Sequence, residues 1–128
     1  MNTEGIEIKF SEQRSLELFK DALSNGLSYL RGYDIVESYS NIEYRQAKEK
    51  LGNPFYEDVL VQILEDGGSI NFVDYESDSI NTIHLEDVIN NMPKVPLNTL
   101  LEVLNDMGDA ISYDVILQTI IFGEVIYG

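Results

Sequence analysis

Strict alternation of apolar and polar residues predicts β-strands in two parts of the chain. Residues 6–10 (IEIKF) place an apolar side chain at every second position, which is the period of a half-buried strand. The segment 69–85 shows the same alternation in two arms, with residues 76–79 between them as a turn. Such an arrangement predicts a β-hairpin. The N-terminal strand and the hairpin are expected to form a small antiparallel sheet.

Apolar residues at three- and four-residue spacing predict helices in most of the remaining chain. The helices are expected at 12–25, 42–51, 54–66, 86–92, 97–107 and 112–122. Asn25-Gly26 is expected to end the first helix, Pro54 to lie in the first turn of the third, and segment 27–40 to be a short helix leading into a loop. The prediction is a single α+β domain over residues 1–128, with a small antiparallel sheet packed against about five or six helices.

The predicted inward faces come from the same spacing. In the helix at 97–107 the expected buried residues are Leu100, Leu101, Leu104 and Met107. In the last helix they are Val115, Ile116 and Ile120. The apolar tail 124–128 is expected to pack rather than fray.

Charge is distributed unevenly along the chain. The net charge is −15; residues 1–50 hold seven of the eight Lys and Arg and nine acids, whereas residues 51–128 hold only Lys94 and fourteen acids. Such a surface repels nucleic acid and anionic membranes, so we expect neither as a direct partner. It attracts basic partners, although acidity also serves solubility. The acidic face is expected to comprise Glu57, Asp58, Glu65, Asp66, Asp74, Glu76, Asp78, Glu86 and Asp87.

Several kinds of chemistry find no support in the sequence. The absence of cysteine excludes disulfides, thiolate metal sites and cysteine nucleophiles. No apolar run approaches the ~18 residues that cross a bilayer, and residues 1–10 do not resemble a secretory signal. No phosphate loop, nucleophile elbow or zinc motif occurs. We expect no cofactor, no metal and no catalytic residue.

Two features, an acidic turn and a single histidine, do not indicate a metal or catalytic site. Asp74-x-Glu76-x-Asp78 resembles the start of a calcium loop, but Ser79 and Leu85 occupy its sixth and twelfth positions, where glycine and glutamate are needed. His84 is the only histidine, and we expect it to face outward from its strand without a catalytic partner. Neither feature has the partners that calcium binding or catalysis needs, which favours a binding protein over an enzyme.

One region combines tyrosine, arginine, lysine and glycine. Such residues suit an anionic ligand through stacking and charge-assisted hydrogen bonds. The candidate ligand residues are Gly26, Tyr29, Arg31, Tyr33, Arg45 and Lys48, with Asp114 and Gln118 from the last helix. Alternatively, the tyrosines pad the edge of the core, and Asp114 and Gln118 form a buried polar network between helices.

The end of the chain is similar to that of a known group of proteins. Residues 114–128 (DVILQTIIFGEVIYG) resemble the D-V-x-L-Q…F-G-E-V-[VI]-Y-G ending of small uncharacterised bacteriophage accessory proteins. Residues 22–30 (ALSNGLSYL) resemble their A-L-x-G-G-S-N-Y-W element, with leucine in place of tryptophan and without the first glycine, and 69–89 resembles their middle hairpin and helix. The resemblance implies a phage accessory protein in the bacterial host cytoplasm and implies no particular activity.

Three functions follow as expectations. The first is a non-enzymatic counter-defence or host-takeover inhibitor that masks a basic surface of a host protein, partly as DNA would. The second is a sponge for an anionic nucleotide second messenger. The third is an oligomeric structural or assembly component of a phage.

Overall fold

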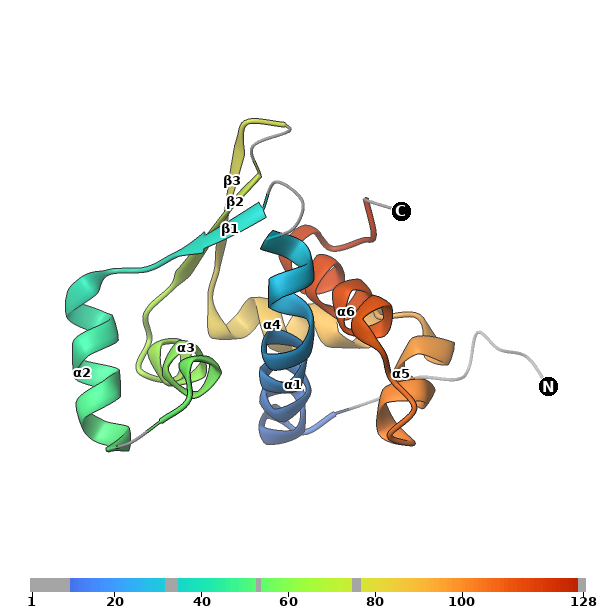
Figure 1. The fold of residues 1–128 in the computed structure, drawn as a ribbon, viewed down its shortest axis with the longest axis horizontal. Helices are drawn as coiled ribbons and strands as arrows, with labels where there is room; N and C mark the ends of the chain where they lie inside the picture. The colour runs from blue at the N-terminus through green and yellow to red at the C-terminus, as the bar shows by residue number, and fades with distance from the viewer. Residues whose placement is uncertain (1–9, 32–34, 53, 75–76, 127–128) are drawn as a thin grey trace.

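A small sheet lies at one edge of a group of helices in the fold, which is that of a computed structural model (Figure 1). The structure describes residues 10–31, 35–52, 54–74 and 77–126, without the side chains of 27–31 and 35–37. The elements are α1 (Glu12–Arg31), β1 (Ile35–Ser38), α2 (Asn41–Leu51), α3 (Tyr56–Glu65), β2 (Ile70–Asp74), β3 (Ser79–Ile83), α4 (Leu85–Asn91), a 3₁₀ turn (Met92–Lys94), α5 (Leu97–Leu104) and α6 (Ala110–Phe122). The predicted α+β class is confirmed.

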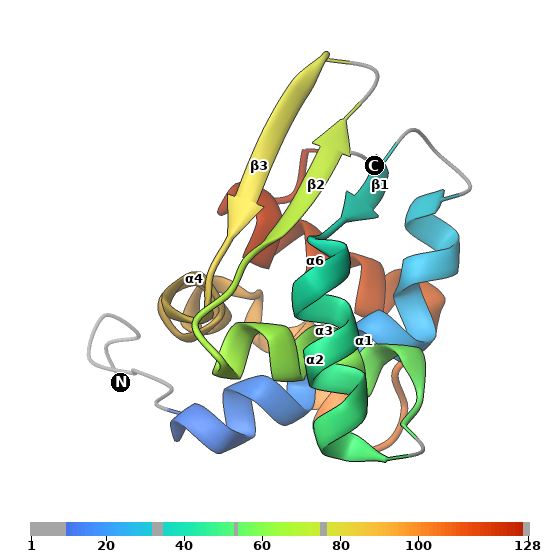
Figure 2. The same ribbon diagram turned by 90° about the vertical axis from the view of Figure 1, so that its left-hand side faces the viewer.

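The sheet is antiparallel, with the strand order β1-β2-β3 (Figure 2). The hairpin of β2 and β3 is confirmed, with Ile70 opposite Ile83. The third strand is β1, where we expected a helix leading into a loop, and Ile35 lies opposite Asp74. Residues 6–9 of the predicted N-terminal strand lie outside the described residues. The local sequence did not reveal β1 because its hydrogen-bond partner lies more than thirty residues further along.

The first helix continues through Gly26, so the predicted stop at Asn25-Gly26 is wrong. Gly26 instead permits close packing between α1 and α6, which form the largest helix–helix contact of the described fold. A Cβ atom at Gly26 would lie 3.1 Å from the backbone carbonyl carbon of Tyr113 and 3.1 Å from Leu117 Cδ1. A glycine that ends a helix and a glycine that admits a neighbouring helix look the same in one sequence.

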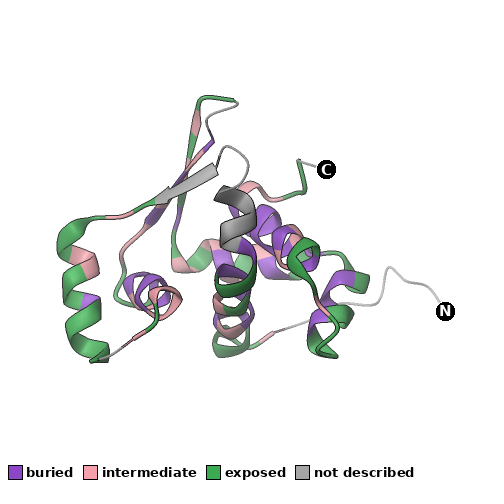
Figure 3. Ribbon diagram, in the orientation of Figure 1, coloured by how far each residue is buried: buried purple, intermediate pink, exposed green. Residues whose placement is uncertain are grey.

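Helix α6 is the centre of the fold. Its residues from Ile116 to Ile121 are all buried, and α1, α4, α5 and β3 pack around it. Figure 3 shows this burial along α6. A helix that is apolar on all sides needs neighbours on all sides. Val115, which we expected inside, is only partly buried.

Several predicted details are corrected. In α5 the buried residues are Thr99, Leu100 and Val103, whereas Leu101, Leu104 and Met107 are exposed. The helix has two apolar stripes, and the sequence alone does not indicate which one meets α6.

Other corrections concern the ends of elements. Leu85 opens α4 instead of closing the second hairpin strand, and Pro54 precedes the N-cap Phe55 of α3 instead of lying in its first turn. In the tail, Val125 and Ile126 are exposed rather than packed. Within the described segments, no helix is long and apolar enough to cross a membrane.

The close packing at Gly26 generates a stability prediction. Gly26→Val should destabilise the protein by about 2 kcal/mol, the usual cost of overpacking a core, because the new side chain meets the backbone of Tyr113. Helix propensity alone would slightly favour valine over glycine. Urea denaturation measures the change, and Ser24→Val, at an exposed position of the same helix, is the control. Equal stability of the two variants would contradict close packing at Gly26.

Candidate functional site

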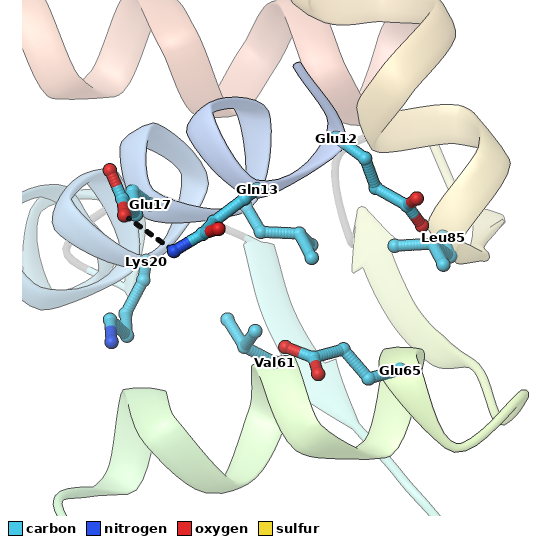
Figure 4. A pocket seen from close by; sticks show the side chains of 8 residues that line it. Glu12, Gln13, Glu17, Lys20, Val61, Glu65 and Leu85 are labelled. Carbon is cyan, nitrogen blue, oxygen red and sulfur yellow. Dashed lines mark hydrogen bonds between the residues drawn. The ribbon is translucent and has the colours of Figure 1, made fainter.

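A groove of about 570 Å³ lies between α1, α3 and the start of α4 (Figure 4). Its lining comprises Glu12, Gln13, Leu16, Glu17, Lys20, Val61, Glu65 and Leu85. The residues from α1 recur at three- and four-residue spacing, so they share one helix face. The inner face of α1 packs against α6. The volume lies within the range of small-ligand sites.

Apolar side chains line part of the groove, and carboxylates flank it. Leu16 and Val61 are buried and Leu85 is partly buried. Glu12 and Glu65 have no hydrogen-bond or ion-pair partner among the described residues. Both acids are therefore available to a ligand.

The other charges of the groove are already engaged. Glu17 accepts from Arg14 at 3.1 Å and from Gln13 Nε2 at 3.4 Å, the contact drawn in Figure 4. Lys20 pairs with Asp58 at 3.3 Å. Glu17 and Lys20 are each paired with a charge outside the groove lining, so the groove is negative because of Glu12 and Glu65.

This combination suits a cationic side chain. The methylene groups of lysine or arginine bury against apolar surface while the charged head remains at a polar rim, and carboxylates form charge-assisted hydrogen bonds to it. The described residues include no group of three or more acids or histidines that could hold a metal ion. The acids of the groove are too dispersed for such a centre.

The structure separates the predicted ligand residues. Arg45 and Lys48 are exposed on α2, which packs on α3, whereas Asp114 and Gln118 are buried in α6. Figures 1 and 2 place α2 and α6 on different sides of the molecule. The prediction that these four residues share one pocket is therefore wrong.

The remaining predicted ligand residues have other surroundings. Gly26 lies in the contact between α1 and α6, which leaves it no room for a ligand. The side chains of Tyr29 and Arg31, and all of Tyr33, lie outside the described residues.

The tyrosines of this region that the structure does describe pack against one another. The rings of Tyr39 and Tyr44 stack with centroids 4.8 Å apart, and Tyr56 lies beside both at 6.1 and 6.2 Å. All three are partly buried against the core. The alternative interpretation, that tyrosines pad the edge of the core, is confirmed for Tyr39 and Tyr44.

Asp114 and Gln118 are buried and hydrogen-bonded to each other, as expected in the alternative to a pocket, but this hydrogen bond lies within α6, and a further one joins Gln118 to the tail instead of to a second helix. Gln118 Nε2 donates to Asp114 Oδ2 at 2.8 Å, and Gln118 Oε1 accepts from the backbone N–H of Ile126 at 3.0 Å. The described residues supply no donor to Asp114 Oδ1. Burial raises the pKa of Asp114, and the hydrogen bond from Gln118 only partly opposes this.

The predicted acidic face is not one surface. Asp74 is fully buried, because strand alternation places it on the same side of β2 as Ile70 and Phe72. It accepts from Ser77 Oγ at 2.9 Å. Its assignment to a partner-binding face is therefore wrong, and Glu76 lies outside the described residues.

Three further acids of that face are engaged within the protein. Asp58 accepts from the N–H of Phe55, Asp87 accepts from the N–H of His84, and Asp66 pairs with Lys50 at 2.8 Å. The remaining acids are Glu57, which is partly buried, and the exposed Glu65, Asp78 and Glu86.

Sequence reasoning missed the groove acids Glu12 and Glu17 because they belong to the nearly neutral first half of the chain. The available signal was helical spacing: both lie within one turn or so of Leu16 on the predicted first helix. His84 is exposed, as expected, but it is the N-cap of α4 and not part of the strand in which we expected it. Its Nδ1 lies 3.8 Å from Asp87 Oδ2.

Comparison with known proteins finds no relative of the chain. No protein-family model, no curated protein and no solved structure matches it. The similarity to bacteriophage accessory proteins therefore stays a prediction.

The buried carboxyl of Asp114 generates a pH-dependent prediction. Burial raises the pKa of Asp114 in the folded protein above its usual value of 3.8. The carboxyl therefore holds its proton more tightly in the folded than in the unfolded state, and the protein loses stability as the pH rises from 3.8 through the folded-state pKa. Asp114→Asn removes this cost. The variant should gain stability relative to the wild type as the pH rises from acid to neutral, because only the wild type must ionise a buried carboxyl.

Thermal melts of both proteins across this pH range measure the difference. Glu49→Gln, which neutralises an exposed carboxylate, should show no such gain. A stability difference between Asp114→Asn and the wild type that does not change with pH would contradict the prediction.

Proposed function

We propose that the protein acts by binding and that the groove between α1 and α3 receives a lysine or arginine side chain from a protein partner. The observation that carries this proposal is the pairing of apolar Leu16 and Val61 with the unengaged carboxylates of Glu12 and Glu65. The net charge of −15 supports it, because a negative field raises the rate at which a basic partner arrives.

Charge alone does not supply the affinity. An exposed ion pair contributes at most about 1 kcal/mol, whereas one buried CH₂ group contributes about 0.8 kcal/mol. The stem of a lysine has four such groups, so burial of the stem in the groove is a larger contribution than an exposed ion pair. The carboxylates mainly determine the association rate and the selection of a basic partner.

In the biological setting that the resemblance implies, the bound partner is a basic protein of the bacterial host. The proposed role is that of a non-enzymatic counter-defence or host-takeover inhibitor which occupies a surface that otherwise binds an anionic molecule. This setting depends on the resemblance of the C-terminal run, whereas the groove chemistry stands without it.

Charge reversal in the groove tests the proposal. Glu12→Lys/Glu65→Lys should abolish capture of basic proteins from a bacterial lysate, because the two added cations repel an incoming lysine or arginine. Glu49→Lys/Glu124→Lys changes exposed acids that do not line the groove and is the control of equal net charge. It should retain the same captured proteins.

With a purified captured partner, the groove variant should bind at least tenfold more weakly than the control, and wild-type affinity should fall as salt is added. Equal loss in both variants would mean that net charge alone attracts the partner. Salt-insensitive binding would contradict the proposal altogether.

A further inference from the structure

Helix α5 presents a second apolar stripe to solvent. Leu97, Leu101 and Leu104 are 48%, 49% and 38% exposed. At about 100° per residue they fall within about 60° of one another around the helix axis. The stripe is therefore a continuous line of leucines along the helix.

The stripe is distinct from the side of α5 that holds the helix in place. Thr99, Leu100 and Val103 are buried, and their centre lies about 120° around the helix from the stripe. Among the described elements, α6 is the principal neighbour of α5. Packing within the fold thus explains Leu100 and Val103 but leaves the stripe unexplained.

Exposed apolar residues continue beyond the helix. Met107 is 75% exposed, and its N–H donates to Glu102 O at 2.7 Å, which keeps the turn against the end of α5. Ile111, in the first turn of α6, is 61% exposed. Isolated exposed apolar residues are common, whereas a contiguous group indicates an interaction site.

The spacing of the stripe matches a helical partner. The steps from Leu97 to Leu101 and from Leu101 to Leu104 are four and three residues, which is the repeat of the seam between two packed helices. Seven residues of helix span about 10 Å. This length corresponds to about two turns of a partner helix.

The charge of this half of the chain identifies the chemistry of that partner. Residues 51–128 hold fourteen acids and one cation, Lys94, which lies three residues before Leu97. Asp106, in the turn after α5, is exposed, whereas Glu102 accepts from Ser112 Oγ and Asp109 accepts from the backbone N–H of Ser112. Two copies of this chain, each with a net charge of −15, would repel one another. A basic helix meets opposite charge instead.

We propose that the α5 stripe (Leu97, Leu101 and Leu104) binds an amphipathic helix of a protein partner, with apolar residues at four- and three-residue spacing and lysine or arginine on its flanks. The apolar stripe supplies the binding free energy, as in other helix-in-groove complexes. The negative charge of the protein selects a basic helix. The α5 stripe contains none of the groove residues, so the stripe proposal and the groove proposal are tested separately.

A synthetic peptide provides the probe. It has three heptads, with leucine at the two seam positions, lysine at the flanking positions and alanine or glutamine elsewhere. A second peptide replaces lysine by glutamate, and a third has the composition of the first with its leucines scrambled off one face. Each is titrated into isotope-labelled full-length protein, and methyl resonances report the site of contact.

The lysine peptide should shift the methyl groups of Leu97, Leu101, Leu104 and Met107, and the other two peptides should bind at least tenfold more weakly. Leu101→Gln, at an exposed helical position, should weaken the lysine peptide at least tenfold. Ile42→Gln, at a 67% exposed position of α2, and Glu12→Gln/Glu65→Gln in the groove should not.

Three results would overturn the proposal. They are equal binding of the glutamate peptide, equal binding by Leu101→Gln, and methyl shifts confined to other elements. A wild-type dimer in solution that Leu101→Gln converts to a monomer would also overturn it, because a second copy would then be the occupant.

Discussion

The enclosure of α6 is the constraint on which the rest of the structure depends. Ile116, Leu117 and Ile120 are fully buried, and burying each such side chain stabilises the fold by roughly 1.5–3 kcal/mol. That burial requires α1 to approach closely, which Gly26 allows. Asp114 and Gln118 lie on the same helix and are buried with it, and Gln118 donates to one carboxyl oxygen of Asp114 while the described residues supply no donor to the other. The free-energy cost of burying the Asp114 carboxyl is thus a consequence of the burial of α6.

Both proposed binding surfaces are parts of helices that this packing leaves uncovered. Helix α1 packs on α6 at Gly26, and its first turns, with Glu12 and Leu16, border α3 and form the groove. Helix α5 uses Leu100 and Val103 on α6 and leaves Leu101 and its neighbours exposed. The two surfaces share a chemistry of apolar contact beside acidic side chains. That combination fits a partner whose basic groups are carried on apolar stems or on an amphipathic helix.

Local patterns predicted the elements that local forces determine. Alternation identified the hairpin, and helical spacing with caps identified α2, which Gly52 ends with φ 83°. Strand β1 was not predicted because its stability comes from pairing with β2. The buried position of Asp74 could have been predicted from its alternation with Ile70 and Phe72. We expected it on the surface because acids are abundant in this half of the chain. The groove could not be predicted, because the packing of α3 on α1 brings Glu65 to Glu12 across more than fifty residues of sequence.

The central claim is that the groove accepts a cation, and a titration with small ions tests it most directly. N-acetyl-arginine amide and a nucleotide are added separately to protein labelled in its carboxyl carbons and backbone amides. The arginine derivative should shift the carboxyl resonances of Glu12 and Glu65 in a saturable manner, and the nucleotide should leave them unchanged. Saturable binding of the nucleotide beside Arg45 and Lys48, with no response of the groove to arginine, would contradict the account.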